Sequence, residues 1–136
     1  MNYITVTEPP AQNQAGVIKI DTGIYSGRGK TKTFQPQAGF SRGDEVVFRA
    51  SVEDAVGPLS GAVVEIRISG PVTNTITSVP SDNNGIAEAK WKTSAPNRKN
   101  GAGGTPMGSY TATVTNVTAT GYDWDKIGTA VGFTIK

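Results

Sequence analysis

The sequence predicts an all-β domain, and three features lead to that prediction. The chain has 13 Val, 10 Ile and 17 Thr but a single Leu, and β-branched residues favour strands whereas Leu favours helices. Its 17 Gly and 8 Pro divide the 136 residues into short segments. No segment keeps apolar residues at helical spacing over several turns. We therefore expect short strands joined by turns.

The first part of the chain is expected to hold a short strand, a break and the beginning of the domain proper. Residues 3–7 have strand-like composition, and residues 8–10, Glu-Pro-Pro, then interrupt the strand with a stiff segment. We accordingly divide the chain into an N-terminal strand or linker, residues 1–10, and a single domain, residues 11–136. Within that domain, residues 17–21 form the first expected strand.

The rest of the chain alternates strands with turn signals. Residues 22–43 are ambiguous, with one expected strand at residues 31–34 that Pro36 should end. Further on, alternating apolar and polar residues predict strands with one buried face. These expected strands are residues 46–53, 63–68, 74–79, 87–92, 110–114 and 127–135. A tight turn containing Asn-Gly is predicted at residues 81–85, because Gly tolerates positive φ.

Seven to eight short strands of this kind predict a two-sheet antiparallel β-sandwich. Their alternation assigns an inward face to each strand. The residues expected to face the core are Val46, Phe48, Ala50, Val52, Val64, Ile66, Ile68, Trp91, Tyr110, Ala112, Val114, Val131 and Phe133. The Gly- and Pro-rich segment from Ala95 to Gly108 is expected to be mobile and to carry no essential contact.

Charge and residue types argue against several classes of function. The 13 Lys and Arg exceed the 11 Asp and Glu by two, which does not give the basic field of a nucleic-acid-binding protein. The absence of His and Cys removes histidine and thiol catalysis, Cys/His metal sites and disulfides. The carboxylates are scattered, so we predict that the chain is not an enzyme and has no cofactor other than a candidate Ca²⁺ ion. No apolar run reaches the roughly 18 residues of a membrane span, so no membrane insertion is expected.

Two short motifs have structural explanations that we favour. Residues 27–31, Gly-Arg-Gly-Lys-Thr, resemble part of a phosphate-binding loop, but Ile24 stands where that loop needs a Gly and Pro36 prevents a following helix. Residues 42–44, Arg-Gly-Asp, match an integrin-recognition tripeptide, yet Gly-Asp is also an ordinary turn before a strand. We interpret them as a basic loop and a turn.

The candidate site lies in residues 121–125. In an extended segment Asp123 and Asp125 point the same way, so their carboxylates are candidate ligands for Ca²⁺. The alternative is a solvated turn with Lys126 as a charge partner. Tyr122 and Trp124 project from the opposite side, where exposed rings would suit a carbohydrate.

Several runs also resemble a bacterial and archaeal Ig-like family, the fibronectin-III-like accessory modules found at the ends of secreted proteases and other exported multidomain enzymes. The runs are residues 60–64, 81–87, 108–114 and 121–123. Together the resemblance covers residues 44–124, and it implies an Ig-like sandwich in which Tyr110 resembles a tyrosine corner. Many relatives carry a cysteine pair near the Asp-Gly turn, which this chain lacks, and residues 1–43 match nothing in the family.

Three functions follow as hypotheses. The first is a non-catalytic Ig-like accessory module, a spacer, stabiliser or presenter excised from a larger exported or cell-surface protein, whose partners are the neighbouring domains of the same polypeptide. The second is a carbohydrate-binding module that uses Trp124 and Tyr122 on a polysaccharide, with Tyr25 as a further candidate ring. The third is an adhesin domain that binds a surface protein through its loops. The first two hypotheses differ in how far Tyr122 and Trp124 are exposed.

Overall fold

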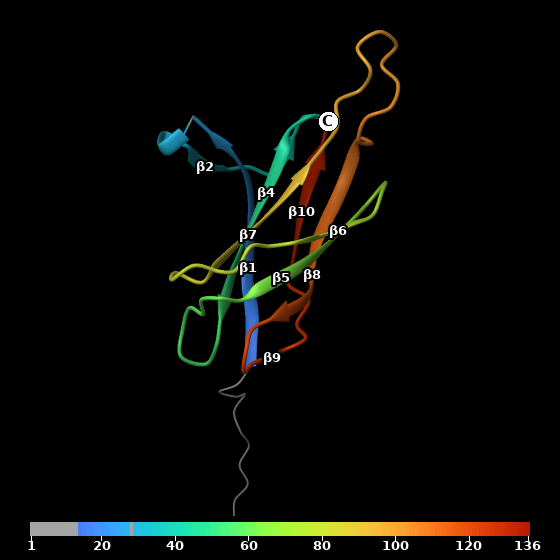
Figure 1. Cartoon of the computed structure of the whole chain (residues 1–136). Helices are drawn as coiled ribbons and strands as arrows, with labels where there is room; N and C mark the ends of the chain where they lie inside the picture. The colour runs from blue at the N-terminus through green and yellow to red at the C-terminus, as the bar shows by residue number, and fades with distance from the viewer. Residues whose placement is uncertain (1–13, 28) are drawn as a thin grey trace, which may run out of the picture.

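The computed structural model describes residues 14–27 and 29–136 and folds them into ten strands in two sheets (Figure 1). The all-β prediction is confirmed, since the helical content of these residues is one 3-10 turn, Gly29–Thr31. They contain no helix that is long and apolar enough to span a membrane. The strand or linker predicted for residues 1–10 lies outside the described residues.

Each sheet has five strands. In the first, the order is β2-β1-β4-β7, and β9 pairs with the beginning of β1. Its strands are β1 (Gln14–Ser26), β2 (Thr33–Pro36), β4 (Glu45–Glu53), β7 (Ile86–Lys92) and β9 (Asp123–Trp124). In the second, the order is β3-β10-β8-β5-β6. Its strands are β3 (Gly39–Phe40), β5 (Val63–Ser69), β6 (Asn74–Thr77), β8 (Gly108–Thr118) and β10 (Ala130–Ile135).

Strand number and direction differ from the prediction in a limited way. Eight of the ten strands have four or more residues, and the two-residue strands β3 and β9 are additional. These two are also the exceptions to antiparallel pairing, because β9 runs parallel to β1 and β3 runs parallel to β10. Alternation of residue types cannot reveal a two-residue strand, since its pairing depends on where the partner lies.

Strand β1 is the largest correction. The sequence predicts residues 17–21, whereas β1 spans 13 residues. It is long because it has successive partners: β9 at its beginning, β4 along its middle and β2 at its end. Pro36 does not end the preceding strand but belongs to β2, which is an edge strand where a missing N–H can be tolerated.

Rings from both sheets meet in the core. Phe133 of β10 stacks on Tyr110 of β8, with ring centroids 5.6 Å apart. Its edges meet Phe48 of β4 at 5.5 Å and Trp91 of β7 at 6.1 Å, both in the first sheet. Such offset and edge-to-face pairs are favourable beyond the area that they bury. The residues predicted to face inward are buried, except Val131, which is half-buried against the cluster.

Val47 is buried as well, although it faces the outer side of β4. It pairs with Gly23 of β1, and the Phe34 ring of β2 lies over that glycine, where an added Cβ would come within 2.7 Å of Cζ. The alternating pattern therefore underestimates how far the outer face of this sheet is covered.

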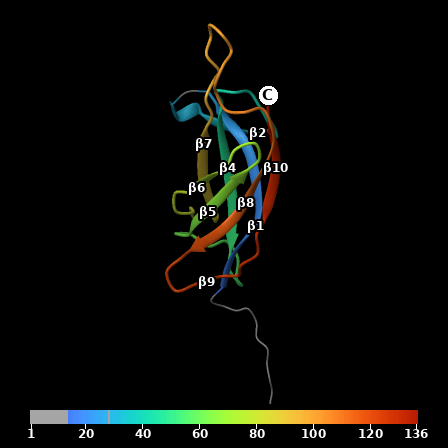
Figure 2. The ribbon, with the colours of Figure 1, turned by 90° about the vertical axis from the view of Figure 1, so that its right-hand side faces the viewer.

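The loop between β7 and β8 projects beyond one end of the molecule, opposite to β9 (Figure 2). It is tied at its base, where the Thr105 N–H donates to the Ser94 carbonyl at 2.9 Å. The Tyr110 hydroxyl donates to the Pro106 carbonyl at 2.6 Å, as in a tyrosine corner. The expectation that this segment carries no essential contact is therefore wrong, because Pro106 anchors a core ring; its mobility stays a prediction.

The central position of Phe48 leads to a first prediction. Phe48 is fully buried, and Phe48→Ala is expected to cost about 3–5 kcal/mol of unfolding free energy because it leaves a cavity between the sheets. Val56 is 95% exposed, so Val56→Ala should change stability by less than about 0.5 kcal/mol. Urea titration of the two variants measures both values, and equal losses would contradict the described register of β4.

Candidate functional site

The predicted site segment lies beside the beginning of β1. Strand β9 brings Asp123 opposite Gln14 and Trp124 opposite Ala15. The Asp125 N–H then donates to the Ala15 carbonyl at 3.0 Å. A turn with Gly121 at φ 85° starts the segment, a conformation that glycine adopts at little cost. The four predicted site residues are therefore held at one end of the sandwich by backbone pairing.

Tyr122 is half-buried against the core, and its hydroxyl donates to Asp54 Oδ2 at 2.9 Å. Asp54 Oδ1 accepts the N–H groups of Val56 at 2.8 Å and Gly57 at 3.1 Å. These bonds, that of Val56 first, lower the pKa of Asp54, and the carboxylate in turn raises the pKa of Tyr122. The Tyr122 hydroxyl thus closes a contact inside the protein instead of facing a ligand.

Trp124 is also half-buried against the core. Its indole N–H is buried and has no hydrogen-bond partner among the described residues. The ring lines a hollow of about 530 Å³ together with Gln14, Asn116, Asp123 and Lys126. Buried polar groups are normally paired, so this N–H is the clearest unmet donor in the predicted site.

The two aspartates have different surroundings. Asp123 is exposed. Asp125 accepts the Ile127 N–H at 2.9 Å through Oδ1, and its carboxylate lies over Gly16, where a Cβ would be 2.0 Å from Oδ2. Among the described residues no group of three or more acidic, His or Cys side chains is placed to hold a metal ion. Ca²⁺ binding by Asp123 and Asp125 stays a hypothesis for which this arrangement supplies no third carboxylate.

The Arg-Gly-Asp tripeptide forms a turn. Gly43 has φ 101°, and the Asp44 carboxylate accepts the Ser41 N–H at 2.8 Å. The Asp44 N–H donates to the Ser41 carbonyl at 3.0 Å. Asp44 is half-buried, so the structural interpretation of this motif accounts for its geometry.

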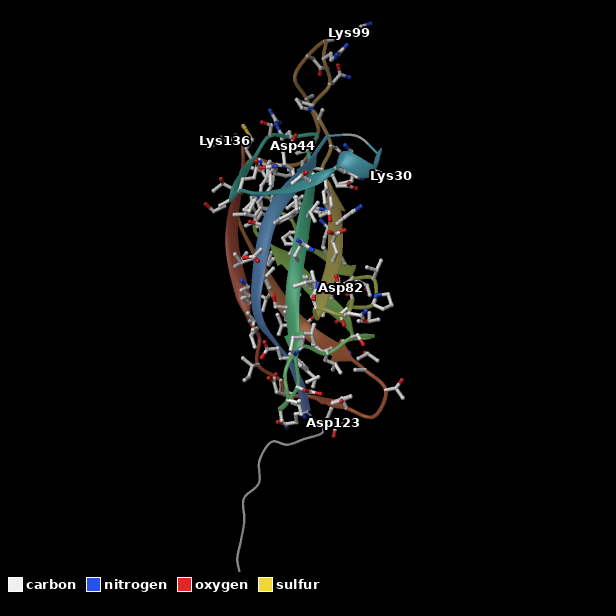
Figure 3. All side chains as sticks on the ribbon, turned by 90° about the vertical axis from the view of Figure 1, so that its left-hand side faces the viewer. Lys30, Asp44, Asp82, Lys99, Asp123 and Lys136 are labelled. Atoms are coloured by element: carbon white, nitrogen blue, oxygen red, sulfur yellow. The ribbon has the colours of Figure 1, made fainter. Side chains whose placement is uncertain are left out.

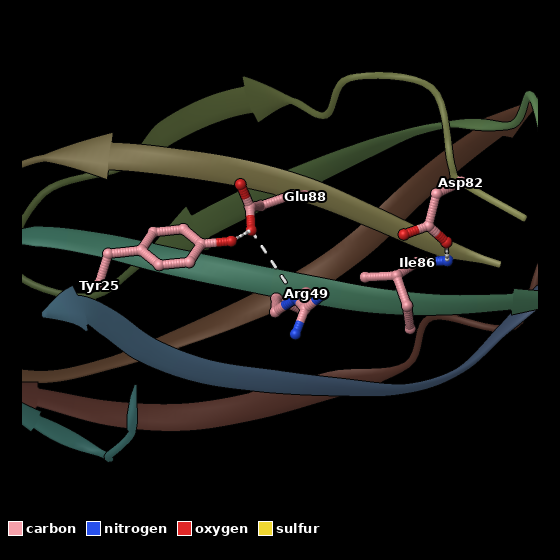
Figure 4. Close-up of polar contacts among 5 residues, drawn as sticks. All are labelled: Tyr25, Arg49, Asp82, Ile86 and Glu88. Atoms are coloured by element: carbon pink, nitrogen blue, oxygen red, sulfur yellow. Dashed lines mark hydrogen bonds and ion pairs between the residues drawn. The ribbon is translucent and has the colours of Figure 1, made fainter. Parts of the chain in front are cut away.

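The structure contains a cluster that the sequence did not reveal. It lies on the outer face of the first sheet, and β2, β1, β4 and β7 each contribute to it. The Tyr25 hydroxyl of β1 donates to Glu88 of β7, and Arg49 Nε of β4 lies 3.7 Å from the same carboxylate (Figure 4). Arg49 also lies over the Phe34 ring of β2 at 5.1 Å, and Lys90 over the Tyr25 ring at 5.5 Å. We call these five residues the outer cluster.

The contacts of the outer cluster link strands of the first sheet, which is a structural role. The bond to Glu88, followed by burial, raises the pKa of Tyr25, so the phenol is a weaker acid than usual and stays protonated at neutral pH. Arg49 is attracted to a ring and to a carboxylate at once, while its buried Nε–H has no hydrogen-bond partner among the described residues. Alternation along each strand could have placed Tyr25, Arg49 and Glu88 on the outer face. Only the pairing of β1 with β4 and of β4 with β7 shows that the three residues are neighbours.

The two ends of the molecule differ in charge, which the net charge of +2 does not show. The basic end carries the β7–β8 loop and the last residue of the chain; Figure 3 labels Lys30, Lys99 and Lys136 there and Asp123 at the opposite end. The basic side chains at this end include Lys30, Arg42, Lys92, Arg98, Lys99 and Lys136, beside Asp44 and Glu45. The acidic end carries Glu53, Asp54, Asp123 and Asp125, beside Lys126.

Comparison with known proteins does not assign this chain to a family. No protein-family model matches it, and no curated protein matches its sequence. The function must therefore be argued from the fold and from the features described above.

The Asp54–Tyr122 contact leads to a second prediction. Asp54→Asn should lower the pKa of Tyr122 toward its ordinary value of 10.0, because a neutral amide no longer opposes formation of the phenolate. A titration followed by ¹³C NMR at the tyrosine Cζ atoms measures the change. Tyr110 is the internal control, since burial raises its pKa, and it should not respond. An unchanged Tyr122 titration would show that the contact is absent in solution.

The hydrogen bonds that Asp54 accepts, from the Val56 N–H first and then from Tyr122, fix the sign of a pH effect on stability. The pKa of Asp54 is lower in the folded protein than its ordinary value of 3.8. Its contribution to folding is therefore fully present above that ordinary value and is lost as the pH falls through the lower, folded pKa.

Proposed function

We propose that this chain is a non-catalytic, Ig-like module that spaces, stabilises or presents a neighbouring domain of a larger exported or cell-surface protein. The observation that carries the proposal is the placement of the first described residue, Gln14, and of the last residue, Lys136. Gln14 begins β1 at the acidic end, next to Asp123, whereas Lys136 ends the chain at the basic end (Figures 1 and 3). Domains attached to such a module would be held apart along its long axis.

The strand order supports the Ig-like part of the proposal. Strands β1, β4 and β7 correspond to the A, B and E strands of an Ig-like sandwich, and β10, β8 and β5 correspond to G, F and C. The Tyr110 bond to Pro106 stands at the corner between the E and F equivalents, where such sandwiches place their tyrosine corner. Parallel pairing of β3 with β10 holds the last strand at its exit.

The pKa values of Tyr25 and Tyr122 support the proposal that the module is non-catalytic. A general base at neutral pH needs a pKa close to that pH. Contacts with Glu88 and Asp54 move the pKa values of Tyr25 and Tyr122 upward, away from it. Both phenols are hydrogen-bonded to carboxylates of the same chain.

A carbohydrate-binding module is the second candidate, and one observation favours it. Trp124 lines a hollow that also contains the polar residues Gln14 and Asn116, while its unpaired indole N–H is itself buried. The amide side chains of Gln14 and Asn116 offer donors and acceptors of the kind that sugar hydroxyls bind. The half-buried ring offers less stacking surface than a fully exposed one, and for this reason we place the spacer function first.

A distance measurement tests the spacer function. The chain contains no cysteine, so Gln14→Cys with Lys136→Cys gives a clean pair for spin labels. Because β1 alone has 13 residues, pulsed electron paramagnetic resonance should find a narrow distribution centred near about 40 Å. A broad distribution, or a centre below about 25 Å, would mean that the module does not hold its two ends apart.

The predicted site is tested separately by binding to polysaccharide and Ca²⁺. We expect no hydrolysis and no retention of the chain on insoluble cellulose, chitin or xylan. Retention that disappears in Trp124→Ala but persists in Trp91→Phe would overturn the spacer function in favour of the second candidate. A Ca²⁺-dependent rise in melting temperature that is lost in Asp123→Asn would identify a structural metal site at the same segment.

A further inference from the structure

We infer that the basic end of this module docks onto the acidic end of a second copy, so that copies associate head to tail. The inference rests on the proposed spacer function and extends it to two modules that follow one another in a polypeptide. It starts from a single property of the fold, the separation of charge between the two ends of one chain.

The basic end presents a projecting part. The β7–β8 loop extends beyond the sheets and carries Arg98 and Lys99 at its tip, where Figure 3 labels Lys99. Both side chains are exposed. Hydrogen bonds within the tip shape it, since the Asn97 N–H donates to the Ala102 carbonyl at 2.8 Å and the Gly101 N–H to the Asn97 carbonyl at 2.7 Å. The two cations are therefore held forward on a folded tip.

The acidic end presents a concave part. The hollow at Trp124 is lined by Asp123 and Asp125, by one cation, Lys126, and by Gln14 and Asn116. A second hollow shares Gln14 and Asp125 with it and is lined by Glu53, Asp54 and apolar residues of β1. Four carboxylates and one lysine thus line two adjacent depressions at the end opposite to the loop. A projecting cationic tip and a carboxylate-lined depression on the same molecule complement each other in shape and in charge.

The direction of the chain matches this pairing. Lys136 lies at the basic end and Gln14 at the acidic end (Figures 1 and 3). When one module follows another in a polypeptide, the basic end of the first faces the acidic end of the second. A covalent connection, which would include the 13 residues before Gln14, raises the effective concentration of the two ends, so the contact does not need the area of about 800 Å² per partner that stable complexes bury.

Nuclear magnetic resonance of the free chain tests the docking. In about 20 mM salt, amide shifts should change with protein concentration into the millimolar range, in residues 97–102 and 123–126 together. Raising the salt to about 500 mM should weaken this association at least about tenfold, because exposed charges are then screened over a few ångströms. Shifts that move elsewhere on the surface, or no concentration dependence at low salt, would overturn the inference.

A matched pair of variants separates docking from net charge. Arg98→Glu with Lys99→Glu should weaken association about fivefold, the factor that two exposed ion pairs of ordinary strength provide. Lys19→Glu with Arg67→Glu makes the same change in net charge on exposed strand positions between the two ends and should leave the dissociation constant unchanged. Equal weakening in both variants would show a net-charge effect and sink the inference.

The result is independent of the spacer test. A narrow end-to-end distance without concentration-dependent shifts would leave the spacer function standing and remove the docking. Concentration-dependent shifts together with a short or broad end-to-end distance would leave the docking standing and remove the spacer function. The amide spectrum of each variant also shows directly whether it is folded.

Discussion

The position of Phe133 is the constraint on which the rest of the structure depends. This single ring of β10 contacts Tyr110 and Phe40 in its own sheet and Phe48 and Trp91 in the other. It thereby fixes the distance and the alignment of the two sheets, as densely packed cores require. With β10 aligned, β3 can pair with it in parallel and hold the C-terminal strand up to the basic end. The packing of Phe133 in the core thus determines where the C-terminal end of β10 lies.

Strand β1 plays the corresponding part at the other end. Its pairing with β9 places Asp123 and Trp124 next to the residue where the described chain begins, and its pairing with β4 and β2 extends the strand along the long axis. The separation of Gln14 from Lys136 therefore follows from one long strand that has different partners along its length. Since the charged loop and the acidic hollows lie at the two ends of the folded part, the features on which the proposals rest are set by strand length and pairing more than by any local motif.

Much of the fold could be predicted because its causes are local. Alternation placed Phe48 in the core, and a turn signal placed Gly85, at φ 80°, before β7. The Tyr110 hydroxyl donates to a carbonyl only four residues earlier, that of Pro106. The candidate site was less accessible. Tyr25 and Glu88 are 63 positions apart, and Tyr122 and Asp54 are 68 apart; no pattern in either segment names its partner.

The sequence by itself determined the all-β class, the inward face of the longer strands and the turns, because side-chain branching, alternation and glycine act within a few residues. The tertiary structure decided the strand order, the length of β1, the outer cluster and the partners of Tyr122 and Asp54. It also decided where the charges lie: a chain of net charge +2 becomes a module with oppositely charged ends only when folding brings distant segments together. The physical reason is that pairing and electrostatic fields depend on distances in space, which the order of residues does not specify.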